Sequence, residues 1–117
     1  MFEITGLQNI YFMPEVRDMR LGYYRLSEII KTQYGRDPYN GDIYMFMSRD
    51  RRRVRIFRYE NETYYLYEKY YEKGMHFMKV EYDLETKNRT YKLDWKEFVI
   101  LLECPVRTLL RPAKKVA

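Results

Sequence analysis

The fold is decided by residues 43–59, which read IYMFMSRDRRRVRIFRY. Two runs rich in β-branched and aromatic residues, Ile43 to Ser48 and Val54 to Tyr59, flank a charged stretch from Arg49 to Arg53. Two such runs joined by a short polar segment are typical of a β-hairpin. We therefore expect an antiparallel hairpin with an arginine-rich turn.

The hairpin concentrates positive charge. Six arginines fall within ten residues, namely Arg49, Arg51, Arg52, Arg53, Arg55 and Arg58. Only Asp50 opposes them. Because alternate side chains of a strand share a face, Arg53 and Arg55 lie on one face and the apolar residues between them on the other. Arg58 has the parity of the apolar residues, which places it either near the strand end or in a buried pair with a carboxylate.

Two interpretations of this arginine cluster stay open. Guanidinium forks match phosphate oxygens, and a two-stranded ribbon can enter the major groove of DNA. Alternatively, a charged hairpin tip is a solvated edge that resists aggregation. The formal net charge of +5 and the pI near 9.2 favour an anionic partner in either case.

Further strands extend the hairpin into a sheet. Thr63 to Tyr71 and Met75 to Tyr82 are rich in aromatic residues, and turn-forming residues precede each of them. With residues 43–59 they predict a four-stranded antiparallel meander. Residues 9–13, followed by Pro14, and residues 90–93 each predict a further short strand.

A helix is expected before the hairpin. Asp18 is a candidate N-cap, and apolar residues then recur at helical spacing: Met19, Tyr23, Leu26, Ile29 and Ile30. Gly22 costs this helix about 1 kcal/mol relative to alanine, which weakens its first turn. Gly35 is the candidate C′ residue that closes it.

A second helix is expected at the end of the domain. Asp94 and Glu97 form a capping-box pattern, the apolar face continues to Leu102, and Pro105 ends the helix. The predicted fold is therefore α+β: an antiparallel β-meander of about four to six strands with an N-terminal helix and a C-terminal helix.

Length and composition predict one domain, at residues 1–105, followed by a basic and flexible tail at residues 106–117. The single Cys104 cannot form an internal disulfide, and the first residues lack the pattern of a secretion signal. The apolar run Phe98 to Leu102 is far shorter than the roughly 20 residues that cross a bilayer. We expect a cytoplasmic protein without a membrane partner.

Catalysis finds little support in the sequence. His76 and Cys104 are the only residues of their types and lie in different elements, so no zinc site and no catalytic nucleophile are predicted. The rival is a metal-dependent nuclease, because Glu85-Thr86-Lys87 and Asp94-Trp95-Lys96 have the acid-x-Lys spacing of such enzymes. The first lies in a polar loop, and capping explains the second. We expect no enzyme, no metal and no cofactor.

The 14 tyrosines are a second unusual feature, and five of them crowd one predicted strand: Tyr64, Tyr65, Tyr67, Tyr70 and Tyr71. Exposed rings can stack on bases or form a protein interface. Strand alternation favours packing, with some rings in the core and others on a half-exposed face.

Several motifs follow one another in a specific order over residues 8–104. They are Asp18-Met19-Arg20, Gly35-Arg36-Asp37-Pro38, Gly41-Asp42, Arg51-Arg52-Arg53, Leu66-Tyr67 with Lys69, and Glu72-Lys73-Gly74-Met75-His76-Phe77. This order resembles the TnpB-type accessory protein, the Orf2-like product of the second reading frame of the IS66 family of bacterial insertion sequences. The chain departs from that family at Tyr59-Glu60 and Thr63-Tyr64, where Trp-Asp and Gly-Phe are usual, and at Tyr70, where a basic residue is usual.

The resemblance implies a helper for transposition that is separate from the strand-transfer enzyme. We predict a non-catalytic accessory protein that binds the transposon ends or target DNA through its arginine-rich hairpin. The alternative is an adaptor that docks on the transposase of the same element. The candidate nucleic-acid-binding residues are Arg49, Arg51, Arg52, Arg53 and Arg55, together with Arg36 and Arg20 in the matching motifs. The oligomeric state stays open.

Overall fold

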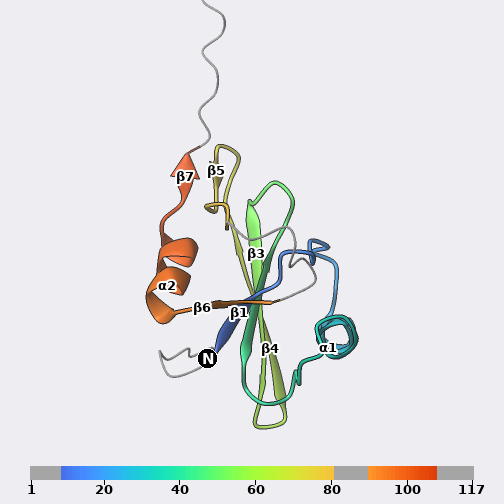
Figure 1. Cartoon of the computed structure of the whole chain (residues 1–117). Helices are drawn as coiled ribbons and strands as arrows, with labels where there is room; N and C mark the ends of the chain where they lie inside the picture. The colour runs from blue at the N-terminus through green and yellow to red at the C-terminus, as the bar shows by residue number, and fades with distance from the viewer. Residues whose placement is uncertain (1–8, 81–89, 108–117) are drawn as a thin grey trace, which may run out of the picture.

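A five-stranded sheet lies between two helices in the computed structural model, which describes residues 9–80 and 90–107 (Figure 1). In chain order the elements are β1 (Ile10–Phe12), α1 (Tyr23–Thr32), β2 (Ile43–Met47), β3 (Arg53–Glu60), β4 (Thr63–Tyr70), β5 (Met75–His76), β6 (Tyr91–Leu93), α2 (Trp95–Glu103) and β7 (Val106–Arg107). Helix α1 covers one face of the sheet and α2 the other. The α+β class with a meander is as predicted.

The strand order of the sheet is β4-β3-β2-β1-β6. Strands β2, β3 and β4 form the expected meander. In its register Met45 pairs with Ile56, and Ile56 pairs with Tyr67. Strand β1 joins the other edge of β2 in parallel, after a crossover through α1, and β6 pairs with β1 in the antiparallel sense. The parallel pair was not predicted.

The prediction that Met75 to Tyr82 forms a fourth strand of the meander is wrong. Of Met75 to Tyr82, only Met75–His76 is a strand within the described residues, and it pairs with β7 in a separate two-stranded sheet. Gly74, with φ +100°, turns the chain after β4, and the Phe77 amide then donates to the carbonyl of Arg51 over 2.6 Å. The segment therefore crosses the end of the hairpin instead of following β4.

Strand β2 is the centre of the core. All five of its residues are buried, which explains why it reads as an uninterrupted apolar run. Met45 faces a cluster on the α2 side that includes Ile56 and Phe98. Tyr44 faces a cluster on the α1 side that includes Phe57.

Helix α1 begins later than predicted. Its N-cap is Gly22, with no side-chain cap, so the proposed cap at Asp18 is wrong. The Asp18 carboxylate instead accepts hydrogen bonds from the backbone amide and Nε of Arg20, at 2.9 and 3.0 Å, a local turn that competes with helix. Met19 is nevertheless buried on the α1-side cluster, which explains its place in the apolar pattern. Gly35 follows the helix with φ +64°, as expected for a residue that closes it.

Helix α2 carries the predicted capping box. The Glu97 amide donates to Asp94 Oδ1 over 2.7 Å, and the Asp94 amide donates to Glu97 Oε1 over 3.1 Å. The helix ends at Glu103, before Pro105. Neither helix of the described chain is long and apolar enough to cross a membrane. Residues 108–117 of the predicted tail and the predicted loop at 84–89 lie outside the described residues.

The cap of α2 gives a stability prediction. Replacing Asp94 by alanine removes the acceptor for the Glu97 amide, and we expect the free energy of unfolding to fall by about 1 kcal/mol. The matched control is Asp94→Ser, which keeps a capping oxygen and most of the stability. Urea unfolding of the three proteins measures the difference. Equal midpoints for the alanine and serine variants would show that the cap does not stabilise the helix.

Candidate nucleic-acid interface

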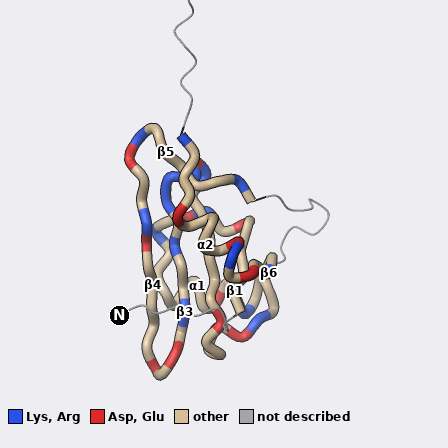
Figure 2. Tube along the Cα trace, turned by 90° about the vertical axis from the view of Figure 1, so that its left-hand side faces the viewer, with Lys and Arg blue, Asp and Glu red and all other residues tan. Residues whose placement is uncertain are grey.

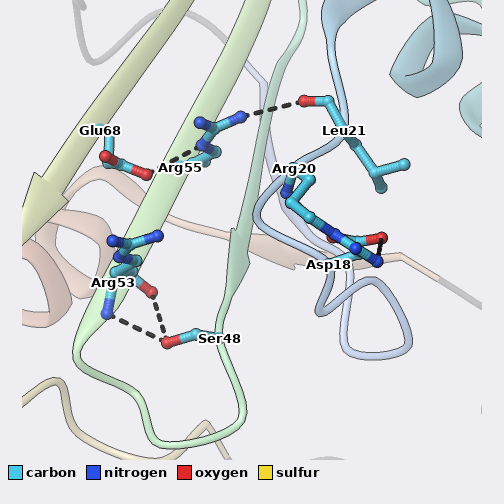
Figure 3. Close-up of polar contacts among 7 residues, drawn as sticks. All are labelled: Asp18, Arg20, Leu21, Ser48, Arg53, Arg55 and Glu68. Carbon is cyan, nitrogen blue, oxygen red and sulfur yellow. Dashed lines mark hydrogen bonds and ion pairs between the residues drawn. The ribbon is translucent and has the colours of Figure 1, made fainter.

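The turn between β2 and β3 is shaped by Ser48 and Asp50. The Ser48 hydroxyl donates to Asp50 Oδ1 over 2.7 Å, and the same oxygen accepts the Arg52 amide over 3.1 Å. The Arg53 amide donates to Ser48 Oγ over 3.1 Å and closes the turn (Figure 3). The hydrogen bond from Ser48, followed by that from the Arg52 amide, lowers the pKa of Asp50 below 3.8. Its stabilising effect is therefore complete above the unfolded pKa and is lost as the pH falls through the lower folded pKa.

Arg51 and Arg52 hold the segment that crosses the end of the hairpin. Arg51, in the left-handed region with φ +55°, donates from Nε to the carbonyl of Phe77 over 3.2 Å. Arg52 donates from Nε to the carbonyl of Tyr71 over 3.2 Å, and its own carbonyl accepts the Tyr71 amide over 2.8 Å. These acceptors are neutral, so they orient the guanidinium groups without neutralising their charge.

Arg53 and Arg55 project from β3 on the α1 side of the sheet (Figure 3). Arg53 lies over the ring of Tyr70, 4.5 Å from its centroid. Arg55 donates from Nε to Glu68 Oε1 over 3.0 Å and from Nη1 to the carbonyl of Leu21 over 2.9 Å. Arg55 therefore ties β3 to β4 and to the segment before α1.

Arg58 is buried and forms an ion pair with Glu60. It also lies two residues before the end of β3, so both alternatives raised by its parity are observed.

Arg20 lines a groove beside the turn, whereas Arg36 lies near the beginning of β2. Arg20 is exposed and paired with Asp18, and this hydrogen bond lowers the pKa of that carboxyl. The guanidinium of Arg36 stacks 3.9 Å from the centroid of Tyr11, and its Nε donates to Thr90 Oγ1 over 2.7 Å. These contacts fix the loop after α1 near the beginning of β6. The arginine-rich turn follows the other end of β2.

Two adjoining grooves border the turn. The larger, here called the mixed-charge groove, has a volume of about 770 Å³. The smaller, here called the cationic groove, has a volume of about 280 Å³. The two share Arg17, Ser48 and Arg49.

The grooves differ in charge. The mixed-charge groove has four arginines and three carboxylates in its walls: Arg17, Arg20, Arg25, Arg49, Glu15, Asp18 and Asp50. The cationic groove has four cations, and no carboxylate of the described chain lines it: Arg17, Arg49, Arg51 and Lys79. The excess of cations over carboxylates in the lining is therefore greater in the smaller groove.

Sequence reasoning missed Arg17 and Lys79. Arg17 follows β1, which lies beside β2, so the crossover brings it to the turn. Lys79 comes two residues after Phe77, whose amide is bonded to Arg51. The sequence around each residue does not indicate its place in the groove, because both residues reach it through pairings between distant segments.

Charge is distributed unevenly along the sheet. Figure 2 shows Lys and Arg gathered toward the end of β3 that follows the β2–β3 turn, and Asp and Glu at the opposite β3–β4 turn. That second turn includes Glu60 and Glu62. The long axis of the sheet therefore has a basic end and an acidic end.

Several of the tyrosines pack against one another. Tyr64 lies at the centre of a group, here called the tyrosine cluster, that consists of Tyr23, Tyr24, Tyr39, Tyr59 and Tyr64. The rings of Tyr23 and Tyr64 stack with centroids 4.7 Å apart. Tyr24 is 73% exposed, so the cluster also presents aromatic surface to solvent.

The structure describes only one of the two acid-x-Lys motifs that raised the possibility of a metal-dependent nuclease. Asp94 is engaged in the α2 capping box, whereas Glu85-Thr86-Lys87 lies outside the described residues. In the part of the chain that the structure describes, no three His, Cys, Asp or Glu residues gather as a metal site.

Comparison with known proteins gives one match. A family model described as IS66 Orf2 like protein matches residues 8–108 of the 117-residue chain. No curated protein and no solved structure matches the chain. The chain therefore belongs to this family, as its motifs indicated, and the family indicates an accessory role in the transposition of an insertion sequence.

Proposed function

We propose that this IS66 Orf2 like protein assists transposition by binding DNA at the basic end of its sheet, and that it does so without catalysis. The observation that carries the proposal is the excess of positive charge around the β2–β3 turn. Transposition acts on DNA, and phosphate contacts supply the sequence-independent part of DNA affinity. Membership of the family and the charge distribution thus support the same partner.

Charge pairing separates the candidate arginines into two groups. Arg20, Arg55 and Arg58 each have a carboxylate partner, so little of their charge is available to a phosphate. Arg51 and Arg52 donate to neutral carbonyls and keep their charge. We assign phosphate contacts to these two, with Arg49 and Arg53 beside them, and a structural role to Arg36 and Arg55.

The turn does not project as an isolated ribbon. The amides of Tyr71 and Phe77 bond to the carbonyls of Arg52 and Arg51, so another segment packs along the end of the hairpin. Such a blunt surface suits the outside of the DNA backbone better than the interior of the major groove. Backbone contacts of this kind position a protein without reading sequence. We therefore expect similar affinity for transposon ends and for unrelated duplex.

A single substitution tests the assignment. Arg49 is exposed, so Arg49→Ala leaves the core intact, and we expect it to reduce the slope of log affinity against log salt by about 0.9. The matched control is Lys96→Ala, which removes one exposed cation from α2. Fluorescence anisotropy with a labelled duplex at several salt concentrations gives both slopes. Identical slopes for Arg49→Ala and Lys96→Ala would refute a specific contact at the turn.

The tyrosine cluster favours a second candidate function, an adaptor that docks on the transposase. Tyr23 and Tyr39 are 42% and 41% exposed, and tyrosine is enriched at protein interfaces. Co-purification with the transposase after nuclease treatment would support the adaptor. Separation of the two proteins under those conditions would count against it.

A further inference from the structure

We propose that the cationic groove is a binding site for a single phosphate group. This inference rests on the proposed function, because it identifies the groove as the point where the protein holds the DNA backbone. It adds Arg17 and Lys79, which lie outside the hairpin, to the binding residues. The shared chemistry is a phosphate oxyanion, whether it belongs to a nucleic acid or to a free ion.

The groove brings together cations from three separate segments. Arg17 comes from the crossover after β1, Arg49 and Arg51 from the β2–β3 turn, and Lys79 from the segment after β5. Four positively charged side chains line a groove of about 280 Å³ and repel one another, and no carboxylate of the described residues is part of its lining. A bound anion relieves this repulsion.

Two of the guanidinium groups are oriented before any ligand arrives. Arg51 donates from Nε to the carbonyl of Phe77, and Arg17 donates from Nε to the carbonyl of Pro14, both over 3.2 Å. These bonds orient the two side chains, and the carbonyls that accept them carry no net charge. A planar guanidinium held in this way is suited to phosphate oxygens.

The apolar lining strengthens the electrostatic interaction. Phe12, Pro14 and Met47 are buried and line the groove beneath the cations. Charges beside apolar side chains are less screened than charges fully surrounded by water. Lys79 is exposed, and its flexible ammonium can follow an anion at the rim.

The charge and position of the groove suit a phosphate that belongs to a longer chain. Arg17 and Arg49 also line the larger mixed-charge groove, so a strand held in the cationic groove can continue into it. The carboxylates in that larger groove disfavour a second phosphate there. The geometry therefore points to one phosphate held firmly, with the neighbouring backbone lying more loosely.

The test uses the full chain labelled with ¹⁵N. We expect titration with inorganic phosphate to shift the amides of Ser48, Arg49, Arg51 and Lys79 saturably. Lys79→Gln removes one charge from an exposed side chain, and we expect it to weaken phosphate binding at least fivefold, whereas Lys96→Gln does not. Matching urea midpoints confirm that both variants are folded. Linear shifts without saturation, or equal effects of the two variants, would overturn the proposal.

Two further arms identify the source of the phosphate and separate this site from DNA binding in general. A short duplex should shift the same amides and compete with inorganic phosphate, and a duplex with neutral methylphosphonate linkages should not. If phosphate saturates the groove but no duplex binds, the groove is a site for free anions and the DNA function fails. If duplex binds equally to wild type and Lys79→Gln while phosphate leaves the groove unchanged, the groove proposal fails and DNA binding stands.

Discussion

Simultaneous replacement of Arg49, Arg51 and Arg52 in the β2–β3 turn is expected to lower duplex affinity at least a hundredfold at about 50 mM salt. The triple variant is Arg49→Ala, Arg51→Asn and Arg52→Ala. Each positive charge that offsets backbone charge contributes roughly 0.9 to the salt slope, so removing three such charges removes up to about 2.7 from it. Asparagine is chosen because Arg51 has φ +55°, a conformation that asparagine tolerates better than alanine. Fluorescence anisotropy measures the loss.

A second triple variant controls for net charge. Lys31, Lys92 and Lys96 are exposed and belong to neither groove, and their replacement by alanine gives the same change in net charge. We expect this variant to bind duplex within about threefold of wild type, since distant exposed charges are screened over about 10 Å at 0.1 M salt. A comparable loss in both triple variants would mean that overall charge, and not the turn, attracts the DNA.

The largest loss of stability is expected from Phe57→Ala. Phe57 is fully buried in β3, and its ring centroid lies 6.5 Å from that of Tyr44 and 6.1 Å from that of Tyr64. Removing a buried phenylalanine ring costs about 3–5 kcal/mol, a large part of the roughly 5–15 kcal/mol that stabilises a typical domain. Urea unfolding followed by circular dichroism measures the difference.

The control for that measurement is Tyr24→Ala. Tyr24 is 73% exposed, so its removal is expected to change the free energy of unfolding by less than about 1 kcal/mol. Similar midpoints for Phe57→Ala and Tyr24→Ala would contradict the placement of the Phe57 side chain in the core on the α1 side of the sheet. A cooperative unfolding transition in both proteins is needed for the comparison.

Local patterns were enough to predict the elements whose structure depends on neighbouring residues. The hairpin of β2 and β3 followed from apolar runs around a polar turn, and the cap of α2 from Asp94 and Glu97. Met19 misled the prediction of α1, because its burial against the core continued the helical spacing before the helix begins. The N-terminal boundary is set by Gly22 and by the local turn at Asp18.

Pairings between distant segments could not be predicted from the sequence. The β-rich run after Gly74 has the composition of a meander strand, and composition does not say which edge a strand will join. The same limit applies to the parallel pairing of β1 with β2. The register of β3 and β4 places Glu68 opposite Arg55, and only this register reveals that Arg55 is paired with a carboxylate.

The candidate site was predicted in outline only. The density of arginines in residues 49–53 identified the basic end of the sheet. Arg17 and Lys79 complete the cationic groove, and they arrive there by the crossover after β1 and by the return of the chain across the hairpin. The protein therefore has a basic surface that is built by topology as well as by local composition.

The salt dependence of duplex affinity is the most direct test of the account that the basic end of the sheet holds the DNA backbone. Four arginines that each offset one backbone charge predict a slope of log affinity against log salt near −3.6, or about two decades of affinity between 50 and 200 mM salt. The triple turn variant is expected to show a slope closer to zero, and the lysine control a slope near that of wild type. Salt-insensitive binding by the wild-type protein, or an unchanged slope in the turn variant, would contradict the claim that the basic end of the sheet holds the DNA backbone.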